Sequence, residues 1–228
     1  MSKVLLASSS PRRRELLSEI ITEFGIFSPD VDESTDDSVS PRDVSGLLAV
    51  RKARAAVAVQ IPFDYLIASD TVVIFQGEIL GKPDDLEHAE EMLTRLRDKT
   101  HEVSTSVAVV SRDSNTTELT ISLVTNLSRV RMRSYSNSEV SSFLESGEAS
   151  DKAGAYAIQD LDFHPVSKCE GCICAVMGLP IHDVESQLTL MGFDGASISR
   201  SKGSYERCKS CLRGDLAVEP SNLSDISI

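Results

Sequence analysis

The sequence predicts an α/β fold with a mixed β-sheet. Short apolar runs typical of buried strands alternate along the chain with segments of helical periodicity, a pattern that favours strands connected through helices. The stretch from Glu102 to Arg133 alternates with period two and is broken at 112–115, which predicts a long antiparallel β-hairpin. With 228 residues, 41% of them hydrophobic, the chain is able to bury a substantial core.

The N-terminal segment has well-marked element boundaries. The apolar run KVLLA (3–7) predicts a strand that stops at the serines after it. Ser10 as N-cap and Pro11 at the first helical position predict a helix that Gly25 ends. The apolar stripe of this helix comprises Leu16, Leu17, Ile20, Ile21 and Phe24.

A second helix, a central strand and a third helix are predicted next. Ser40-Pro41 repeats the helix start signal, and the helix reaches about Val59. The run 65–75 is rich in β-branched and aromatic residues and predicts a central strand. Asp84 caps a helix whose apolar residues stand at helical spacing: Leu86, Ala89, Leu93 and Leu96.

The C-terminal part is predicted from shorter signals. Ser136 and Glu139 form a capping box for a helix. Short strands are expected at 155–158 and 172–177, and a last helix starts at Pro180.

Domain organisation follows from where the apolar periodicity fades. Residues 1–192 are predicted to form one domain, and residues 193–228, rich in serine, glycine and charge, a mostly disordered tail.

The charge balance restricts the partners. Lys and Arg number 23 and Asp and Glu 35, for a formal net charge of −12, so the chain repels the phosphate backbone of nucleic acid polymers and anionic membrane surfaces. No apolar stretch approaches the roughly 18 residues of a membrane span, and no signal peptide is recognisable. Five cysteines, all from Cys169 onward, indicate reduced thiols. We expect a cytoplasmic protein that binds neither nucleic acid polymers nor membranes.

Three consecutive arginines, Arg12, Arg13 and Arg14, fall in the first turn of the helix that Ser10 caps. The helix dipole disfavours each cation there by roughly 0.3–1 kcal/mol. A phosphate group would reverse that effect, because free backbone N–H groups, serine hydroxyls and guanidinium groups would converge on it. The alternative is that the arginines extend into water or pair with the acidic loop at 30–37.

Other candidate residues are scattered along the chain. Asp70 is a carboxylate within an apolar strand, costly to bury unless it is paired, binds a metal or titrates, although an Asp that caps a turn would explain it too. Glu33, in the acidic loop, is a weaker candidate because such loops are usually solvated. Lys82 lies between a glycine and a proline, and this segment lacks the spacing of a phosphate-binding Walker loop. Lys152 and Gln159 lie in a segment of small residues that permits close backbone approach to a ligand.

Taken in order, these segments resemble the Maf family of nucleoside triphosphate pyrophosphatases. The matching segments are SSSPRR (8–13), Glu33, RKARA (51–55), SDTVV (69–73), GKP (81–83), DKAGAYAIQ (151–159) and VMGLPI (176–181), and the likeness runs from about Lys3 to Leu190.

The resemblance implies a fold, an activity and a set of roles. The family has an elongated mixed sheet flanked by helices, with two lobes around a central cleft, and is often dimeric. It hydrolyses nucleoside triphosphates to the monophosphate and pyrophosphate with a divalent metal, Mg²⁺ or Mn²⁺. Thr71 and the sequence of segment 151–159 resemble those of the branch of the family that acts on dTTP and UTP.

Roles are carried over residue by residue. Asp70 matches the general base and Glu33 a metal-site carboxylate. Asp70 is also a candidate metal ligand beside Glu33, so its role is that of base, ligand or both. Arg12, Thr71 and Gln159 match the specificity positions, and Arg13, Lys52 and Lys82 match the phosphate-binding cations. Ser10 and Lys152, candidates from the residues themselves, complete the predicted substrate-binding set. Asp160 departs from the family, which commonly has glycine there, and adds a charge beside Gln159.

Two other functions fit parts of the sequence. CEGCIC (169–174) and CKSC (208–211) supply two C-x2-C pairs, so Cys169, Cys172, Cys174, Cys208 and Cys211 are candidate zinc ligands of an interaction module. The family's link to septum formation also suggests a nucleotide-binding regulator of cell division without turnover.

Overall fold

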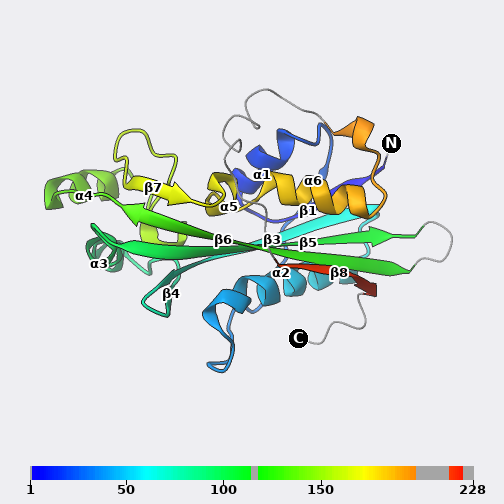
Figure 1. Ribbon diagram of the computed structural model, residues 1–228, viewed down its shortest axis with the longest axis horizontal. Helices are drawn as coiled ribbons and strands as arrows, with labels where there is room; N and C mark the ends of the chain where they lie inside the picture. The colour runs from blue at the N-terminus through cyan, green and yellow to red at the C-terminus, as the bar shows by residue number, and fades with distance from the viewer. Residues whose placement is uncertain (1, 114–117, 199–215, 223–228) are drawn as a thin grey trace.

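The computed structural model describes residues 2–113, 118–198 and 216–222. In this part of the chain, eight strands form one mixed sheet that runs the length of the molecule (Figure 1). The strands are β1 Val4–Ala7, β2 Gly25–Phe27, β3 Tyr65–Phe75, β4 Glu78–Leu80, β5 Thr100–Arg112, β6 Leu119–Met132, β7 Val166–Glu170 and β8 Leu216–Asn222. Their order is β2-β1-β3-β5-β6-β7, with β4 on β3 and β8 on β6.

The pairing directions confirm the predicted mixed α/β sheet. β1 is parallel to β2 and β3, whereas β3, β5 and β6 pair with their other neighbours antiparallel. β5 and β6 form the predicted hairpin.

Helices cover both faces of the sheet. They are α1 Pro11–Ser18, α2 Pro41–Ala58, α3 Leu86–Leu96, α4 Asn137–Glu145, α5 Ile173–Val176 and α6 Ile181–Leu190, with short 3₁₀ turns at Ala153–Ala155 and Gly195–Ser197. In Figure 1, α1, α5 and α6 lie on one side of the sheet and α2 on the other.

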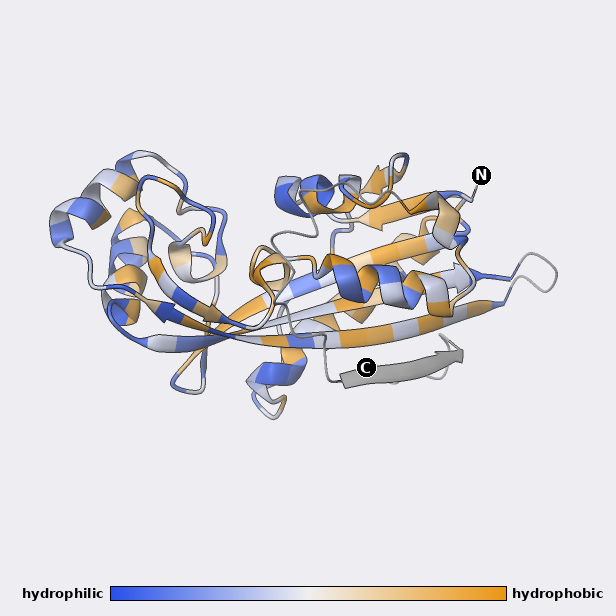
Figure 2. Ribbon diagram, turned by 45° about the horizontal axis from the view of Figure 1, so that its top comes forward, coloured by the Kyte–Doolittle hydropathy of each residue, from blue (hydrophilic) through white to orange (hydrophobic). Residues whose placement is uncertain are grey.

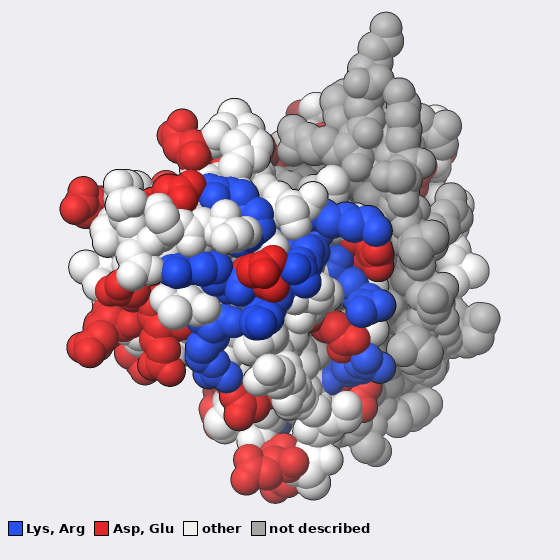
Figure 3. All heavy atoms as spheres, turned by 60° about the vertical axis from the view of Figure 1, so that its left-hand side comes forward, with Lys and Arg blue, Asp and Glu red and all other residues white. Residues whose placement is uncertain are grey.

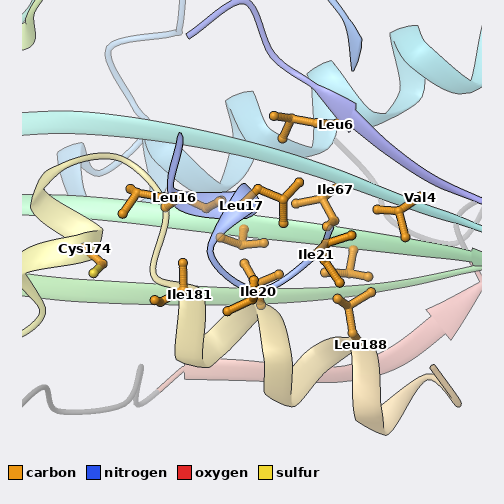
Figure 4. Close-up of a cluster of buried hydrophobic side chains, with 14 of the residues drawn as sticks. Val4, Leu6, Leu16, Leu17, Ile20, Ile21, Ile67, Cys174, Ile181 and Leu188 are labelled. Atoms are coloured by element: carbon orange, nitrogen blue, oxygen red, sulfur yellow. The ribbon is translucent and has the colours of Figure 1, made fainter. Parts of the chain in front are cut away.

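Alternation along the central strands builds a core on each face. On β3, Ile67 packs with α1 and α6, whereas its neighbours Leu66 and Ala68 pack with α2. Figure 4 shows Leu16 and Leu17 of α1 close to Ile181 of α6 in the first of these cores. Successive residues of a strand point to opposite faces, so one apolar run serves both.

A third core forms a second lobe at one end of the sheet (Figure 2). Val73 and Phe75 at the end of β3 pack there with α3, α4 and Tyr156. The long strands β3, β5 and β6 run through both lobes, so the two lobes share one sheet. The lobes meet near the middle of these strands.

Several predicted boundaries are confirmed. β3 spans the predicted 65–75, and α2 starts at Pro41 as its Ser-Pro signal indicates. The capping box is present, since Ser136 Oγ accepts from the Glu139 backbone N–H and the Glu139 side chain accepts from the Ser136 N–H.

The predicted extent of the first helix is wrong. α1 ends at Ser18, and Gly25 opens β2 instead of ending the helix. Ile20 and Ile21 are buried as the stripe predicts, but from a turn. Pairing of Gly25 with Leu5 of β1 requires the chain to turn back before that point. The cap of α3 is likewise Asp85 and not Asp84.

Two predicted strands are also wrong. Segment 172–177 forms α5, where Cys172 Sγ accepts from the Ala175 N–H as an N-cap. A run of six apolar residues is too short to reveal its period. Segment 155–158 forms no strand: Ala155, with φ of 59°, ends the 3₁₀ turn Ala153–Ala155, and no residue of the segment pairs with the sheet. β7 was not predicted.

Parts of the segment 193–228, predicted as a mostly disordered tail, belong to the described fold. Phe193 and Ile198 are buried in the core with α1 and α6, and Phe193 packs edge-on against Tyr65 with ring centroids 5.1 Å apart. Segment 216–222 is strand β8, antiparallel to β6. The ordered fold therefore extends past the predicted boundary at Gly192, and the rest of the tail lies outside the described residues.

Gly171, between β7 and α5, is required by its surroundings. It has φ of +131°, and a Cβ there would lie 2.5 Å from Ser128 Oγ and 2.9 Å from Ser128 Cα. We expect Gly171→Ala to lower the free energy of unfolding by about 2–4 kcal/mol in urea denaturation. Gly147→Ala, at φ +76° with nothing within 4 Å, isolates the backbone effect and should cost about 1 kcal/mol. Equal losses in both variants would exclude the contact with Ser128 as the cause.

His101 makes the fold sensitive to acid. Its side chain is 2% exposed and its Nε2 lies 2.7 Å from the Tyr156 hydroxyl oxygen. Burial lowers the pKa of His101 to about 4 from 6.5. Between pH 6.5 and pH 4, His101 is therefore protonated in the unfolded chain but neutral in the folded chain. The free energy of unfolding should fall by about 3 kcal/mol as the pH is lowered through this range.

Urea denaturation at pH 7 and pH 4.5 checks this expectation. The pH-dependent loss of stability should be clearly smaller in His101→Gln than in the unsubstituted protein. The same loss in both proteins would show that other groups cause it.

Candidate active site

The candidate site lies where β3 crosses from one lobe to the other. Residues 65–68 of β3 pair with β1, and residues 73–75 pair with β4 on the same edge, since β5 occupies the other edge. Between them, no described strand pairs with 69–72 on that edge. Asp70 and Thr71 stand in this gap, beside the carboxyl end of β1, where the chain turns through Ser8–Ser10 into α1. The carboxyl end of a parallel strand is a common place for ligands in α/β sheets.

The predicted site residues come together there. One cavity of about 590 Å³ is lined by all ten of them: Ser10, Arg12, Arg13, Glu33, Lys52, Asp70, Thr71, Lys82, Lys152 and Gln159. They come from α1, the acidic loop, α2, β3, the loop after β4 and the segment 151–159. The tertiary structure thus joins residues separated by up to 149 positions in the sequence.

Lys52 links the two acidic candidates. Its Nζ lies 2.5 Å from Asp70 Oδ1 and 2.7 Å from Glu33 Oε1. Asp70 is 6% exposed and Lys52 9% exposed, so the buried carboxylate is paired as its cost of burial requires. Burial alone would raise the pKa of Glu33, but the hydrogen bond and charge of Lys52, with the charges of Lys82 and Arg13, outweigh it and hold that pKa below its usual value.

Arg13 is fixed in the wall of the cavity. Its Nε donates to the Gly178 carbonyl at 2.9 Å and its Nη2 to Thr71 Oγ1 at 3.3 Å. Burial lowers the pKa of Arg13, and the nearby charge of Asp70 opposes that shift. The Thr105 hydroxyl oxygen lies 3.1 Å from Thr71 Oγ1, so the hydroxyl of Thr71 is shared between Arg13 and Thr105.

A second charged group joins the two lobes across the cavity. The Asp151 carboxylate lies 3.4 Å from Arg12 Nη1 and 2.7 Å from Lys152 Nζ. Lys152 is buried, and Glu148 accepts from it as well. Burial acts to raise the pKa of Asp151, but the hydrogen bond from Lys152 and the charge of Arg12 hold it below its usual value.

Lys82 and Gln159 remain available to a ligand. Neither side chain has a hydrogen bond or ion pair to another residue in the described part of the chain, and both are exposed at the cavity. The Gly154 N–H donates to the Gly81 carbonyl at 3.0 Å, which joins the segments that carry Lys82 and Gln159.

The cavity is cationic although the chain is acidic. Its lining has five basic side chains, Arg12, Arg13, Lys52, Lys82 and Lys152, and three carboxylates, Glu33, Asp70 and Asp151. Figure 3 shows one face of the molecule on which Lys and Arg gather, with Asp and Glu around and between them. Arg14 is exposed and does not line the cavity, so two of the three consecutive arginines converge there and the third does not.

Sequence reasoning missed three residues of this site. Gly178, whose carbonyl binds Arg13, has φ of +115°, and a Cβ there would lie 3.3 Å from Arg13 Nε. Asp151 and Gly178 both fall within segments that match the family, which is the signal that could have found them. Thr105, on β5, lies in no such segment, and only the register of β5 beside Thr71 reveals it.

Asp160 does not alter the cavity. Its Oδ1 accepts from the backbone N–H of Asp162 at 3.1 Å and of Phe163 at 2.6 Å, and it does not line the cavity. The carboxylate stabilises a turn beside Gln159.

Two of the three cysteines of CEGCIC (169–174) are buried in the core. Cys172 and Cys174 are buried in the same cluster as residues of α1 and α6, and Figure 4 shows Cys174 at the edge of that cluster. Cys169, Cys172 and Cys174 form no disulfide bond within the described residues, and no group of three or more His, Cys, Asp or Glu suited to a metal occurs there. Cys208 and Cys211 lie outside the described residues.

The carboxylates of Glu33 and Asp70 nevertheless suit a divalent ion whose other ligands are water and substrate oxygens. Glu33 and Asp70 present two carboxylates to one ammonium group, and both line the cavity. Mg²⁺ usually binds through one or two carboxylates and completes its shell with water and substrate phosphates. These residues therefore fit the metal that the resemblance implies.

Comparison with known proteins agrees with this geometry. The family model described as "Maf-like protein" matches residues 3–191. A dTTP/UTP pyrophosphatase of Symbiobacterium thermophilum is 40% identical over 195 residues, which cover 85% of this chain and 96% of that protein. The dTTP/UTP pyrophosphatases of Hahella chejuensis and Myxococcus xanthus are each 41% identical, over 78% and 83% of this chain and 87% and 92% of their own lengths. The fold, the cavity and these matches together show that the chain belongs to the Maf family.

Proposed function

We propose that this protein hydrolyses dTTP and UTP to the nucleoside monophosphate and pyrophosphate. The observation that carries the proposal is the buried Asp70 carboxylate within a cavity lined by five basic side chains. The names of the relatives, dTTP/UTP pyrophosphatase, support the same reaction and nucleotides.

The basic side chains have the first task. A nucleoside triphosphate carries up to four negative charges, and water must attack its α-phosphorus while pyrophosphate leaves with the bridging oxygen. Arg13 and Lys52 are held rigidly, and Lys82 is free to reach the leaving phosphates. Preorganised cations stabilise charge that develops in the transition state, which is usually the largest single contribution to catalysis.

Asp70 has the second task. It faces the cavity from β3 and would accept the proton of the attacking water, while Lys52 holds its carboxylate in place. Glu33 and Asp70 are the carboxylates of the cavity that would hold Mg²⁺ or Mn²⁺. A bound divalent ion would lower the pKa of its water ligand and offset phosphate charge.

Base selection would rest on Gln159. Its amide offers both a donor and an acceptor and is free, whereas the Thr71 hydroxyl is already engaged by Arg13 and Thr105. Thr71 would shape the site beside it. A polar group left unpaired by the wrong base costs far more than a poor apolar fit.

The other proposed functions have less support. A regulator without turnover would not need the paired Asp70 and Lys52 in a cationic cavity, and the zinc module would require cysteines that instead pack in the core. No helix among the described residues has the length and apolarity to cross a membrane. Reduced thiols at Cys169, Cys172 and Cys174, together with a nucleotide substrate, favour the cytoplasm. The proposal also includes a homodimer.

Asp70→Asn should reduce kcat for dTTP by at least about 10³-fold, because the amide cannot accept the proton. Nucleotide binding should remain, since no cation is removed. Pyrophosphate release with Mg²⁺ or Mn²⁺, beside a sample without divalent ion, measures turnover, and equilibrium binding measures affinity. Asp162→Asn, an exposed carboxylate outside the cavity, is the matched control and should retain full activity. Turnover by Asp70→Asn close to that of the control would exclude Asp70 as the base.

A panel of nucleoside triphosphates tests selectivity. The unsubstituted protein should prefer dTTP and UTP over ATP and 7-methyl-GTP. Gln159→Ala should reduce that preference by about tenfold in kcat/KM through loss of a hydrogen bond to the base. Asp160→Asn should leave it unchanged, because that side chain binds backbone. Preference for a purine nucleotide would contradict the assignment.

A further inference from the structure

The loop that carries Glu33 is held in place from one helix. Residues 28–35, between β2 and α2, form no helix or strand. Within the described residues, the hydrogen bonds and ion pairs that join 28–35 to the rest of the chain all come from Arg51 and Lys52 of α2. Glu33 is thus positioned by two consecutive residues of α2.

Arg51 holds the backbone on either side of Glu33. Its Nη1 donates to the Asp32 carbonyl at 3.2 Å and to the Ser34 carbonyl at 2.6 Å. The Ser34 N–H donates to Asp32 Oδ1 at 2.8 Å and closes a turn around the same residue. With both neighbouring carbonyls bound to one guanidinium group, the orientation of residue 33 is restricted.

The contacts of Lys52 and of Arg51 with the loop would respond differently to a bound substrate. Lys52 lines the cavity and already divides its charge between Glu33 and Asp70, so phosphate oxygens would compete with both for its N–H groups. Arg51 does not line the cavity and binds carbonyl groups that no phosphate displaces. Its hold on the loop is therefore independent of the chemistry in the cavity.

We propose that Arg51 is a positioning residue for Glu33. It keeps the Glu33 carboxylate beside Lys52 and facing the cavity while Lys52 binds phosphate. The proposal rests on the proposed function for the role of Glu33, but the placement of the loop by Arg51 is a property of the protein without substrate.

A double-substitution cycle tests the link to Glu33. Arg51→Ala should lower kcat/KM for dTTP with Mg²⁺ by about tenfold, because a displaced carboxylate loses much of its effect. Arg51→Lys, which keeps a donor of charge +1, should recover part of that loss. In a Glu33→Gln background, Arg51→Ala should change kcat/KM less than twofold, since residues that act as a unit are not additive.

The matched control is Arg54→Ala, which removes a positive charge from the same helix outside the cavity and should retain activity. Full activity of Arg51→Ala, or a tenfold loss that persists in the Glu33→Gln background, would overturn the proposal.

Hydrogen exchange measured by mass spectrometry tests whether Arg51 holds the loop, independently of catalytic activity. In the protein alone, Arg51→Ala should raise exchange in peptides covering 28–40, whereas Arg54→Ala should leave it unchanged and exchange in β3 should not differ. Unchanged exchange in 28–40 would overturn the positioning role even if activity falls. An unsubstituted protein that does not hydrolyse dTTP or UTP would count against the proposed function, while the exchange result would still decide how the loop is held.

Discussion

The site depends on the pairing of one buried carboxylate with one buried ammonium group. Asp70 lies within β3, where an unpaired charge would cost several kcal/mol, and Lys52 of α2 lies 2.5 Å from it. This pair fixes how α2 sits against the sheet at that point. It also brings a cation and a carboxylate to the same cavity, so the contact that stabilises the buried charge places both groups where the proposed reaction would use them.

The long strands explain why this happens at the middle of the molecule. β3 carries apolar residues into the core of each lobe, and its edge is unpaired by described strands only between the segments that β1 and β4 cover. Polar residues of β3 are concentrated in that interval, Ser69 to Thr71. Loops from both lobes converge on the interval and supply the remaining charges.

Local charge decides the chemistry in spite of the net charge of −12. Five basic side chains line the cavity, and the three carboxylates that line it pair with Arg12, Lys52 and Lys152. Contacts such as Asp151 with Arg12 and Lys152 would have to exchange for phosphate contacts on binding. A site of this kind accepts a triphosphate without making the whole surface attractive to nucleic acid polymers.

Much of this protein follows from its sequence alone. Helix caps at Ser10 and Ser136, the strand 65–75 and the hairpin are local signals, and the ordered set of segments pointed to the family and to the ten residues of the cavity. Short runs such as 172–177 were misread because six apolar residues fit a strand and a helix equally, and Gly25 was misread because its role depends on pairing with β1. The partners of each side chain, such as Thr105 beside Thr71 or Arg51 on the carbonyls around Glu33, were decided by the tertiary structure. Caps and periodicity act over a few residues, whereas strand register and the packing of α2 bring together groups far apart in the chain.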